Sequence, residues 1–78
     1  MSREESNKLK YTIALIAEFA DKFSIGKRQA YNYLKRFKGL EFLNTHYGVE
    51  HTQSFENTVE DLSIVCNRNG GKLKYTLS

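Results

Sequence analysis

Apolar residues recur at helical spacing through the first third of the chain. Between residues 7 and 23 they form a broad stripe of Leu9, Ile13, Ile16, Ala17, Ala20 and Phe23, widened by Leu15 and Phe19. Intervals of three and four residues place such side chains on one face of an α-helix. The opposite face carries the polar side chains of Lys8, Glu18, Asp21 and Lys22. We therefore predict a first helix over 7–23 and expect it to be the most buried element.

Two further helices are predicted between residues 25 and 47. The stripe of the second helix, over 25–38, consists of Ala30, Tyr31, Leu34 and Phe37. Ser24 suits its N-cap, because a serine hydroxyl can accept from backbone N–H groups two or three residues further on. Gly39 interrupts the pattern before a short third helix striped by Leu40, Leu43 and Tyr47. We expect Gly48 to end that third helix in a left-handed conformation.

The fourth stripe contains Phe55, Val59, Leu62 and Cys66, at intervals of four, three and four residues. Ser54 or Thr52 begins this helix, and the Asn-Gly-Gly sequence at 69–71 ends it. Four helices joined by short turns predict an all-α fold, a compact bundle of four short helices. The single domain spans residues 1–78, with a frayed N-terminus over 1–7, a helical core over 8–70 and a tail over 71–78. The tail alternates polar and apolar residues, which predicts either disorder or a short strand that pairs with another chain.

Length and composition exclude several classes of protein. A chain of 78 residues forms one domain and buries only roughly 60% of its unfolded surface, so a homodimer or another partner is a natural supplement to its stability. The single cysteine, Cys66, excludes an internal disulfide and fits a reducing cytoplasm. The polar N-terminus does not resemble a signal peptide, and no apolar run approaches the roughly 20 residues that cross a bilayer. We expect a soluble cytoplasmic protein without membrane association.

Charge is distributed unevenly along the chain, although the formal net charge is only +3. Residues 27–38 contain five basic residues and no acid, whereas residues 41–69 contain five acids and one basic residue, Arg68. The basic residues are Lys27, Arg28, Lys35, Arg36 and Lys38, and the acids are Glu41, Glu50, Glu56, Glu60 and Asp61. A basic segment can attract nucleic acid, and an acidic one can attract a basic protein surface. An ordinary solvated surface has the same composition.

Residues 19–34 match the spacing of a helix-turn-helix. Ala20 is small where two helices would approach closely, Ser24 starts the turn, and Ile25 and Ala30 would fill the angle between the helices. The second helix would then open with Lys27, Arg28, Gln29 and Asn32. Arginine and lysine side chains bind guanine edges or phosphates, and the amides of Gln and Asn pair with adenine. DNA is therefore one candidate partner, provided that Lys27 and Arg28 project freely.

The polar turn His51-Thr52-Gln53 lies between the third and fourth helices. His51 has two interpretations: a proton shuttle or partner contact, or a structural group. In the structural interpretation Thr52 caps the fourth helix, while His51 and Gln53 hydrogen-bond the backbone of the turn. We favour the structural interpretation, because helix ends leave backbone groups that such side chains satisfy.

At this turn the chain resembles a family of short bacterial helical proteins, domain of unknown function 3791. The residues that carry the resemblance are Tyr47, His51, Thr52, Gln53, Val59, Glu60, Asp61 and Leu62, preceded by the segment 37–43. The resemblance covers roughly residues 9–70, and one departure is Glu50, where family members more often carry an apolar residue. It implies a small helical protein often encoded near an ADP-ribosyltransferase-like toxin, without an established activity or catalytic residue.

Signals for catalysis are weak. His46 and His51 are not spaced to share a helix face, Cys66 lies on an apolar stripe, and Glu60 and Asp61 point roughly 100° apart on a helix. We therefore expect no enzyme, no cofactor and no metal. We expect a non-catalytic interaction module that binds another protein, either as an antitoxin-like partner of a toxin-like enzyme or as a regulator. Its expected anchor is an exposed aromatic side chain, Tyr33, Tyr75 or Phe42.

Overall fold

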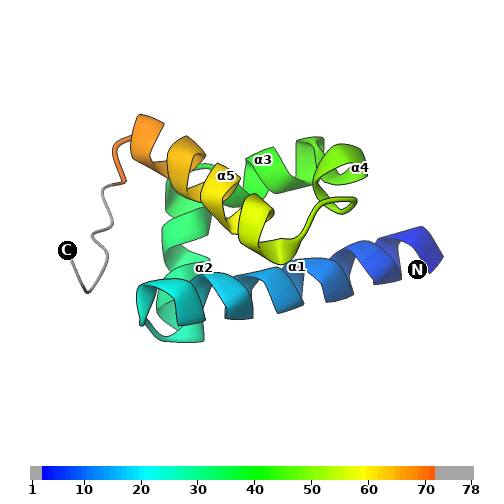
Figure 1. Cartoon of the computed structure of the whole chain (residues 1–78), viewed down its shortest axis with the longest axis horizontal. Helices are drawn as coiled ribbons and strands as arrows, with labels where there is room; N and C mark the ends of the chain where they lie inside the picture. Colours follow the sequence, from blue (N-terminus) through cyan, green and yellow to red (C-terminus); the bar gives the residue numbers. More distant parts are fainter. Residues whose placement is uncertain (1–2, 72–78) are drawn as a thin grey trace.

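The computed structural model describes residues 3–71, which form five α-helices and no strand (Figure 1). The helices are α1 (Arg3–Phe23), α2 (Lys27–Arg36), α3 (Gly39–Thr45), α4 (Tyr47–Glu50) and α5 (Phe55–Arg68). The predicted all-α class is confirmed, with four helices of seven or more residues and the single turn α4 in addition. The strand or disorder predicted for the tail falls on residues 72–78, outside the described residues. Over residues 3–71 no helix is both long and apolar enough to cross a membrane.

The longest element, α1, runs along one side of the molecule for about 31 Å. It packs against α2 and α5, and α3 in turn packs against the same two helices. Figure 1 shows α2 near the C-terminal end of α1, α5 and α3 above its middle, and the N-terminal turns of α1 extending past the other helices. Only part of α1 therefore has partners on more than one side.

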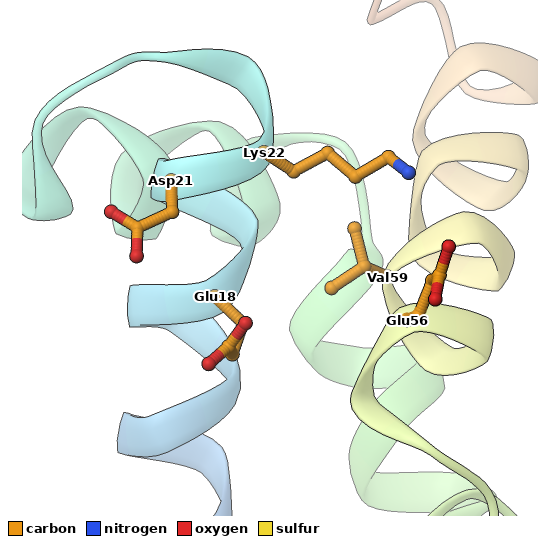
Figure 2. A pocket seen from close by; sticks show the side chains of 5 residues that line it. All are labelled: Glu18, Asp21, Lys22, Glu56 and Val59. Atoms are coloured by element: carbon orange, nitrogen blue, oxygen red, sulfur yellow. The ribbon is translucent and has the colours of Figure 1, made fainter.

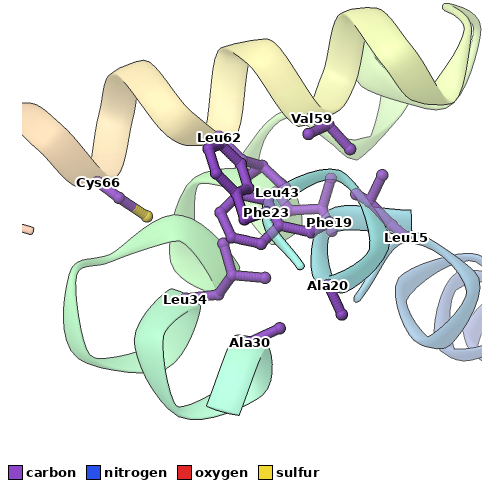
Figure 3. Close-up of a cluster of buried hydrophobic side chains, with 10 residues drawn as sticks. All are labelled: Leu15, Phe19, Ala20, Phe23, Ala30, Leu34, Leu43, Val59, Leu62 and Cys66. Atoms are coloured by element: carbon purple, nitrogen blue, oxygen red, sulfur yellow. The ribbon is translucent and has the colours of Figure 1, made fainter. Parts of the chain in front are cut away.

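The core lies where α1, α2, α3 and α5 meet (Figure 3). Its fully enclosed members come from all four helices: Leu15, Phe19, Ala20, Phe23, Ala30, Leu34, Leu43, Val59, Leu62 and Cys66. Removing a large apolar side chain of this kind from water contributes about 1.5–3 kcal/mol, so this cluster supplies most of the driving force for folding. The predicted core role of Cys66 is confirmed, because its side chain is fully buried and burial raises the pKa of the thiol to about 11.

The predicted stripe of α1 is wrong at its N-terminal end. Leu9 is 51% exposed and Ile13 is 60% exposed, whereas Leu15 and Phe19 are fully buried. The difference arises because α2 packs near the C-terminal end of α1 (Figure 1), so it does not cover Leu9 and Ile13 in the N-terminal half. Periodicity defines an apolar face but does not say how much of that face a partner reaches.

Two predicted caps are also wrong. Ser24 has φ +54°, and the Ile25 N–H donates to the Ala20 carbonyl at 3.0 Å, which is the hydrogen bond of a Schellman motif that ends α1. The N-cap of α2 is Gly26, not Ser24. Gly48 lies inside α4 without a positive φ, so the chain continues into another helical turn instead of ending at a left-handed glycine. The C-terminal end of α5 follows the prediction, since Gly70 has φ +94°.

Candidate functional site: a basic helix, a polar turn and an apolar groove

The four candidate DNA-binding residues lie together on α2, and all four side chains are exposed: Lys27, Arg28, Gln29 and Asn32. The inner side of α2 is held by the buried Ala30 and Leu34. On the outer side Arg28, Asn32 and Lys35 are separated by four and three residues, so they share one face. No acid occurs in α2, and this face is therefore basic along its whole length.

The residues of the expected helix-turn-helix pattern lie at the corner between α1 and α2. Ala20 and Ala30 are buried where α1 and α2 approach, and Ile25 is partly buried between them. Ser24 adopts the left-handed conformation that glycine normally supplies in a sharp turn. The spacing therefore describes a real corner between two packed helices, with the basic face of α2 on the outside.

A second charged feature lies between α1 and α5. Glu18, Asp21, Lys22, Glu56 and Val59 line a cleft of about 370 Å³, and Figure 2 shows the Lys22 side chain extending from α1 toward α5. The amine of Lys22 partly offsets the three carboxylates. Among residues 3–71 no group of three His, Cys, Asp or Glu side chains is arranged to hold a metal ion.

His51 and Thr52 fix the backbone of the polar turn. The Nδ1 atom of His51 lies 2.6 Å from the Tyr47 carbonyl, and its ring stacks on the Tyr47 ring at 4.5 Å. The Thr52 hydroxyl donates to the Val49 carbonyl at 2.6 Å. The structural interpretation of His51 is thus supported, but Thr52 does not cap the next helix. That cap is Ser54, whose hydroxyl accepts from the Asn57 N–H at 3.2 Å.

Gln53 was expected to hydrogen-bond the backbone of the turn, but it binds a side chain instead. Its amide donates to the Asp61 carboxylate at 3.0 Å. The neighbouring Glu60 is exposed and takes no part in this contact. Four of the residues that carry the family resemblance therefore form two contacts, a stacked pair of Tyr47 and His51 and a hydrogen bond between Gln53 and Asp61.

The sequence did not predict a role for Glu50, but the structure places this residue at the centre of the turn. Its side chain is only 5% exposed, and its carbonyl accepts from the hydroxyls of Tyr11 and Thr58, both at 3.1 Å. Burial, followed by the hydrogen bond to Asp61 and the charge of Asp61, raises the pKa of Glu50 to about 7. A protonated Glu50 can donate a hydrogen bond to the Asp61 carboxylate.

Tyr11 connects this turn to α1 through aromatic contacts. Its ring centroid lies 5.5 Å from that of Tyr47 in an edge arrangement and 5.6 Å from that of Phe55. The amine of Lys8 lies 5.4 Å from the centre of the Tyr47 ring. Burial raises the pKa of the Tyr11 hydroxyl above its ordinary value, with Thr58 opposing that shift. The N-terminal half of α1 is consequently held on one flank, the flank that faces α4 and α5.

The other flank of this half of α1 is open. Lys8, Leu9, Thr12 and Asn44 line a groove of about 400 Å³ between α1 and α3, and the exposed Ile13 follows one turn after Leu9. We call this surface, together with Ile13, the α1 groove. The sequence pattern does not indicate this groove, because the helical periodicity predicts that Leu9 and Ile13 are core residues.

Two of the three aromatic anchors predicted from sequence, Tyr33 and Phe42, pack against other side chains. The Tyr33 hydroxyl donates to the Gly71 carbonyl at 2.6 Å, and its ring packs on Phe19 at 5.8 Å, so Tyr33 belongs to the edge of the core. Phe42 is partly buried and packs against the His46 ring at 4.7 Å. Tyr75 lies outside the described residues. Any apolar anchor among the described residues must therefore come from another surface.

Comparisons with known proteins bear on the family alone. Neither a curated protein nor a solved structure matches the chain. One family model, described as protein of unknown function (DUF3791), matches residues 10–69, which span α1 from its third turn to the end of α5. Because that match covers most of the chain, the chain belongs to the family of proteins of unknown function DUF3791.

Proposed function

We propose that the chain is a non-catalytic protein-interaction module, an antitoxin-like or regulatory partner that acts on another protein in the bacterial cytoplasm. The observation that carries the proposal is the exposure of Leu9 and Ile13 on the N-terminal half of α1. Two large aliphatic side chains four residues apart offer a partner one continuous apolar strip.

The energetics favour covering this strip. Burying an exposed aliphatic side chain contributes about 1.5–3 kcal/mol, and neither side chain gains this within residues 3–71. Removing both is expected to change the stability of the isolated domain by no more than about 0.5 kcal/mol each, because exposed positions rarely matter more. The two residues are therefore better explained by binding than by folding.

The non-catalytic part of the proposal is supported by the position of Glu50. This carboxyl, with a pKa of about 7, has the value that general acid–base catalysis favours. It is nevertheless buried, and its side chain hydrogen-bonds that of Asp61. A group enclosed in this way orders the turn and is not presented to a substrate.

The test is recovery of a partner from cells of the source organism with an affinity-tagged chain after cross-linking. We expect a specific partner to be recovered with the wild type and lost with a Leu9→Ser/Ile13→Ser double variant. Ile64→Ser is the matched control, because Ile64 is 50% exposed on α5 and lies outside the α1 groove. Recovery of the same partner with the double variant would refute the proposal.

A second candidate function, DNA binding by α2, is favoured by the exposure of Lys27 and Arg28. Both side chains are exposed at the start of α2, directly after the sharp turn at Ser24. Arg28, Asn32 and Lys35 would face the major groove, and Lys27 would contact phosphate. Both functions can coexist in one chain, because they use different surfaces.

Fluorescence anisotropy with labelled random duplex DNA, at about 50 and 200 mM salt, tests this second function. We expect micromolar binding that weakens steeply with salt and is lost in a Lys27→Ala/Arg28→Ala variant. A Lys8→Ala/Lys10→Ala variant is the control, because it removes the same charge from α1. Absence of binding at the lower salt concentration, or equal losses in both variants, would exclude specific use of α2.

A further inference from the structure

We propose that α2 contacts both phosphate backbones of a DNA duplex, one with each of its two flanks. The inference rests on the second candidate function, DNA binding by α2, and adds the contacts that lie beside the major groove. The two flanks are defined by exposed side chains, Lys27 and Tyr31 on one side and Gln29 and Arg36 on the other.

Helix geometry separates these flanks from the outer face of α2. Successive residues of a helix are about 100° apart around its axis. Arg28 lies on the outer face, opposite the buried residues of α2. Lys27 and Tyr31 lie about 60–100° to one side of Arg28. Gln29 and Arg36 lie about 80–100° to the other side, so hydrogen-bond donors occur on three exposed sides of one helix.

The exposure of Tyr31 is explained by this arrangement. The helical pattern places Tyr31 on the apolar stripe of α2, but the structure leaves it 41% exposed and outside the core cluster. The amine of Lys35 lies 5.9 Å from the centre of the Tyr31 ring, which adds a second positive charge beside that of Lys27. A tyrosine hydroxyl is one of the donors that bind phosphate oxygens in complexes with DNA. An exposed tyrosine beside two lysines therefore suits a phosphate backbone.

The opposite flank has an equivalent pair of donors. The guanidinium carbon of Arg36 lies 5.4 Å from the centre of the Phe37 ring, and Phe37 is partly buried against the core. This contact holds the charge of Arg36 at the end of α2. Gln29 lies two helical turns earlier, about 10 Å along the axis. Each flank thus combines one cation with one neutral donor, and both residue types bind phosphate.

The dimensions and the charge of α2 select a duplex. The major groove is about 12 Å wide and an α-helix with its side chains is about 10–12 Å across, so a helix seated there has a phosphate backbone on each flank. A single strand or an acidic protein segment has one charged edge and leaves one flank unused. The ten residues of α2 include four basic residues and no acid, which suits a polyanion on every exposed side.

The experiment measures the affinity of the full chain for labelled random duplex DNA by fluorescence anisotropy at several salt concentrations between about 50 and 200 mM. Arg36→Gln removes one phosphate contact, so the slope of the logarithm of the binding constant against the logarithm of the salt concentration should become shallower by about 1. Tyr31→Phe removes a hydroxyl and no charge. It should weaken binding by about threefold to tenfold and leave the slope unchanged.

Matched variants on other surfaces are the controls. Arg68→Gln removes the same charge from an exposed position in the last turn of α5, and Tyr47→Phe removes a phenolic hydroxyl from the polar turn. Both should bind the duplex as the wild type does. A change of slope in Arg68→Gln equal to that in Arg36→Gln would show that net charge alone governs binding, and would overturn the inference.

The remaining outcomes separate the inference from the function on which it rests. Binding that is lost in Lys27→Ala/Arg28→Ala but unchanged in Tyr31→Phe and Arg36→Gln would leave DNA binding standing and show that the flanks make no contact. Equal or tighter binding of a single strand of the same length, or of polyglutamate, would overturn the duplex in favour of that partner. Absence of binding to the duplex at the lowest salt concentration would remove the function and the inference together.

Discussion

Replacing Glu50 with glutamine should stabilise the domain at alkaline pH and leave it almost unchanged in acid. The Glu50 side chain is 5% exposed, hydrogen-bonded to Asp61, and has a pKa raised from the ordinary 4.5 to about 7. Between about pH 4.5 and pH 7 the Glu50 carboxyl is therefore protonated in the folded chain and ionised in the unfolded chain. Glutamine resembles the protonated form, because it is neutral and its amide can donate to Asp61.

The sign follows from proton linkage. Between about pH 4.5 and pH 7 the folded state binds more protons at Glu50 than the unfolded state, so the free energy of unfolding falls as the pH rises. Above about pH 7 Glu50 is ionised in both the folded and the unfolded state, and the free energy of unfolding falls no further through this group. A pKa difference of about 2.5 units corresponds to roughly 3 kcal/mol, which is an upper bound for this group. Domains of this size are stable by only about 5–15 kcal/mol, so the effect is large.

Urea unfolding followed by circular dichroism at about pH 5, 6, 7 and 8 measures the effect. Glu50→Gln should match the wild type near pH 5 and exceed it by up to roughly 3 kcal/mol at pH 8. Glu60→Gln is the control, since it removes the same charge from an exposed position of α5. Wild-type stability that does not fall between pH 5 and pH 8, or a Glu50→Gln variant no more stable than wild type at pH 8, would refute the burial argument.

Four further substitutions test the packing and the turns by the same urea assay. Leu15→Ala removes a fully buried side chain and should cost about 2–5 kcal/mol, so a loss below about 1 kcal/mol would contradict the core assignment. A Cβ at Gly39 would lie 2.8 Å from Leu34 Cδ2, so Gly39→Ala should lower the free energy of unfolding by about 1–3 kcal/mol. Gly48 is a helical glycine with open space around it, so Gly48→Ala should raise the free energy of unfolding by up to about 1 kcal/mol. Ser24→Gly should stabilise by about 0.5–1 kcal/mol, because it relieves a left-handed backbone, and destabilisation would show that the serine side chain contributes to the turn.

The helices could be predicted because their apolar residues alternate at intervals that only a helix brings to one side. Phe19, Phe23 and Leu62 are core residues on this criterion alone. The exposure of Leu9 and Ile13 could not be predicted, since it depends on how far α2 and α3 reach along α1. The reach of a neighbouring helix is a tertiary property, and no local pattern encodes it.

Local ambiguity explains the errors at the turns. Serine is both a good N-cap and a polar residue tolerated beyond a helix end, and at Ser24 the packing of Ile25 against the core selects the second role. Gly48 permits a left-handed cap but does not require one, and here the carbonyl of His46 accepts from the Glu50 N–H and continues the helix. In each case the residue allows two conformations, and contacts distant in sequence decide between them.

Candidate sites made of neighbours in sequence could also be predicted, whereas those made of residues distant in sequence could not. The set Lys27, Arg28, Gln29 and Asn32 could be predicted to lie together, because its members are neighbours on one short helix, but Lys35, which shares a face with Arg28 and Asn32, lies outside that set. The Glu50–Asp61 pair could not, since its members are eleven residues apart and belong to different elements. The available signal was the position of Asp61 in α5, next to the buried Leu62 and one turn after the buried Thr58, where a carboxylate needs a buried partner.

One long helix carries both proposed surfaces and keeps them apart. The α1 groove lies at Leu9 and Ile13, whereas the corner that presents α2 begins at Phe23, about 15–20 Å further along α1. That separation is about two Debye lengths at physiological salt, so Lys8 and the basic residues of α2 influence one another weakly. A protein bound in the groove would leave Lys27 and Arg28 uncovered. The geometry therefore allows a single small domain to bind a protein and a nucleic acid at once, and a partner in the groove can regulate DNA binding only by steric reach beyond this domain or by moving α1 against α2.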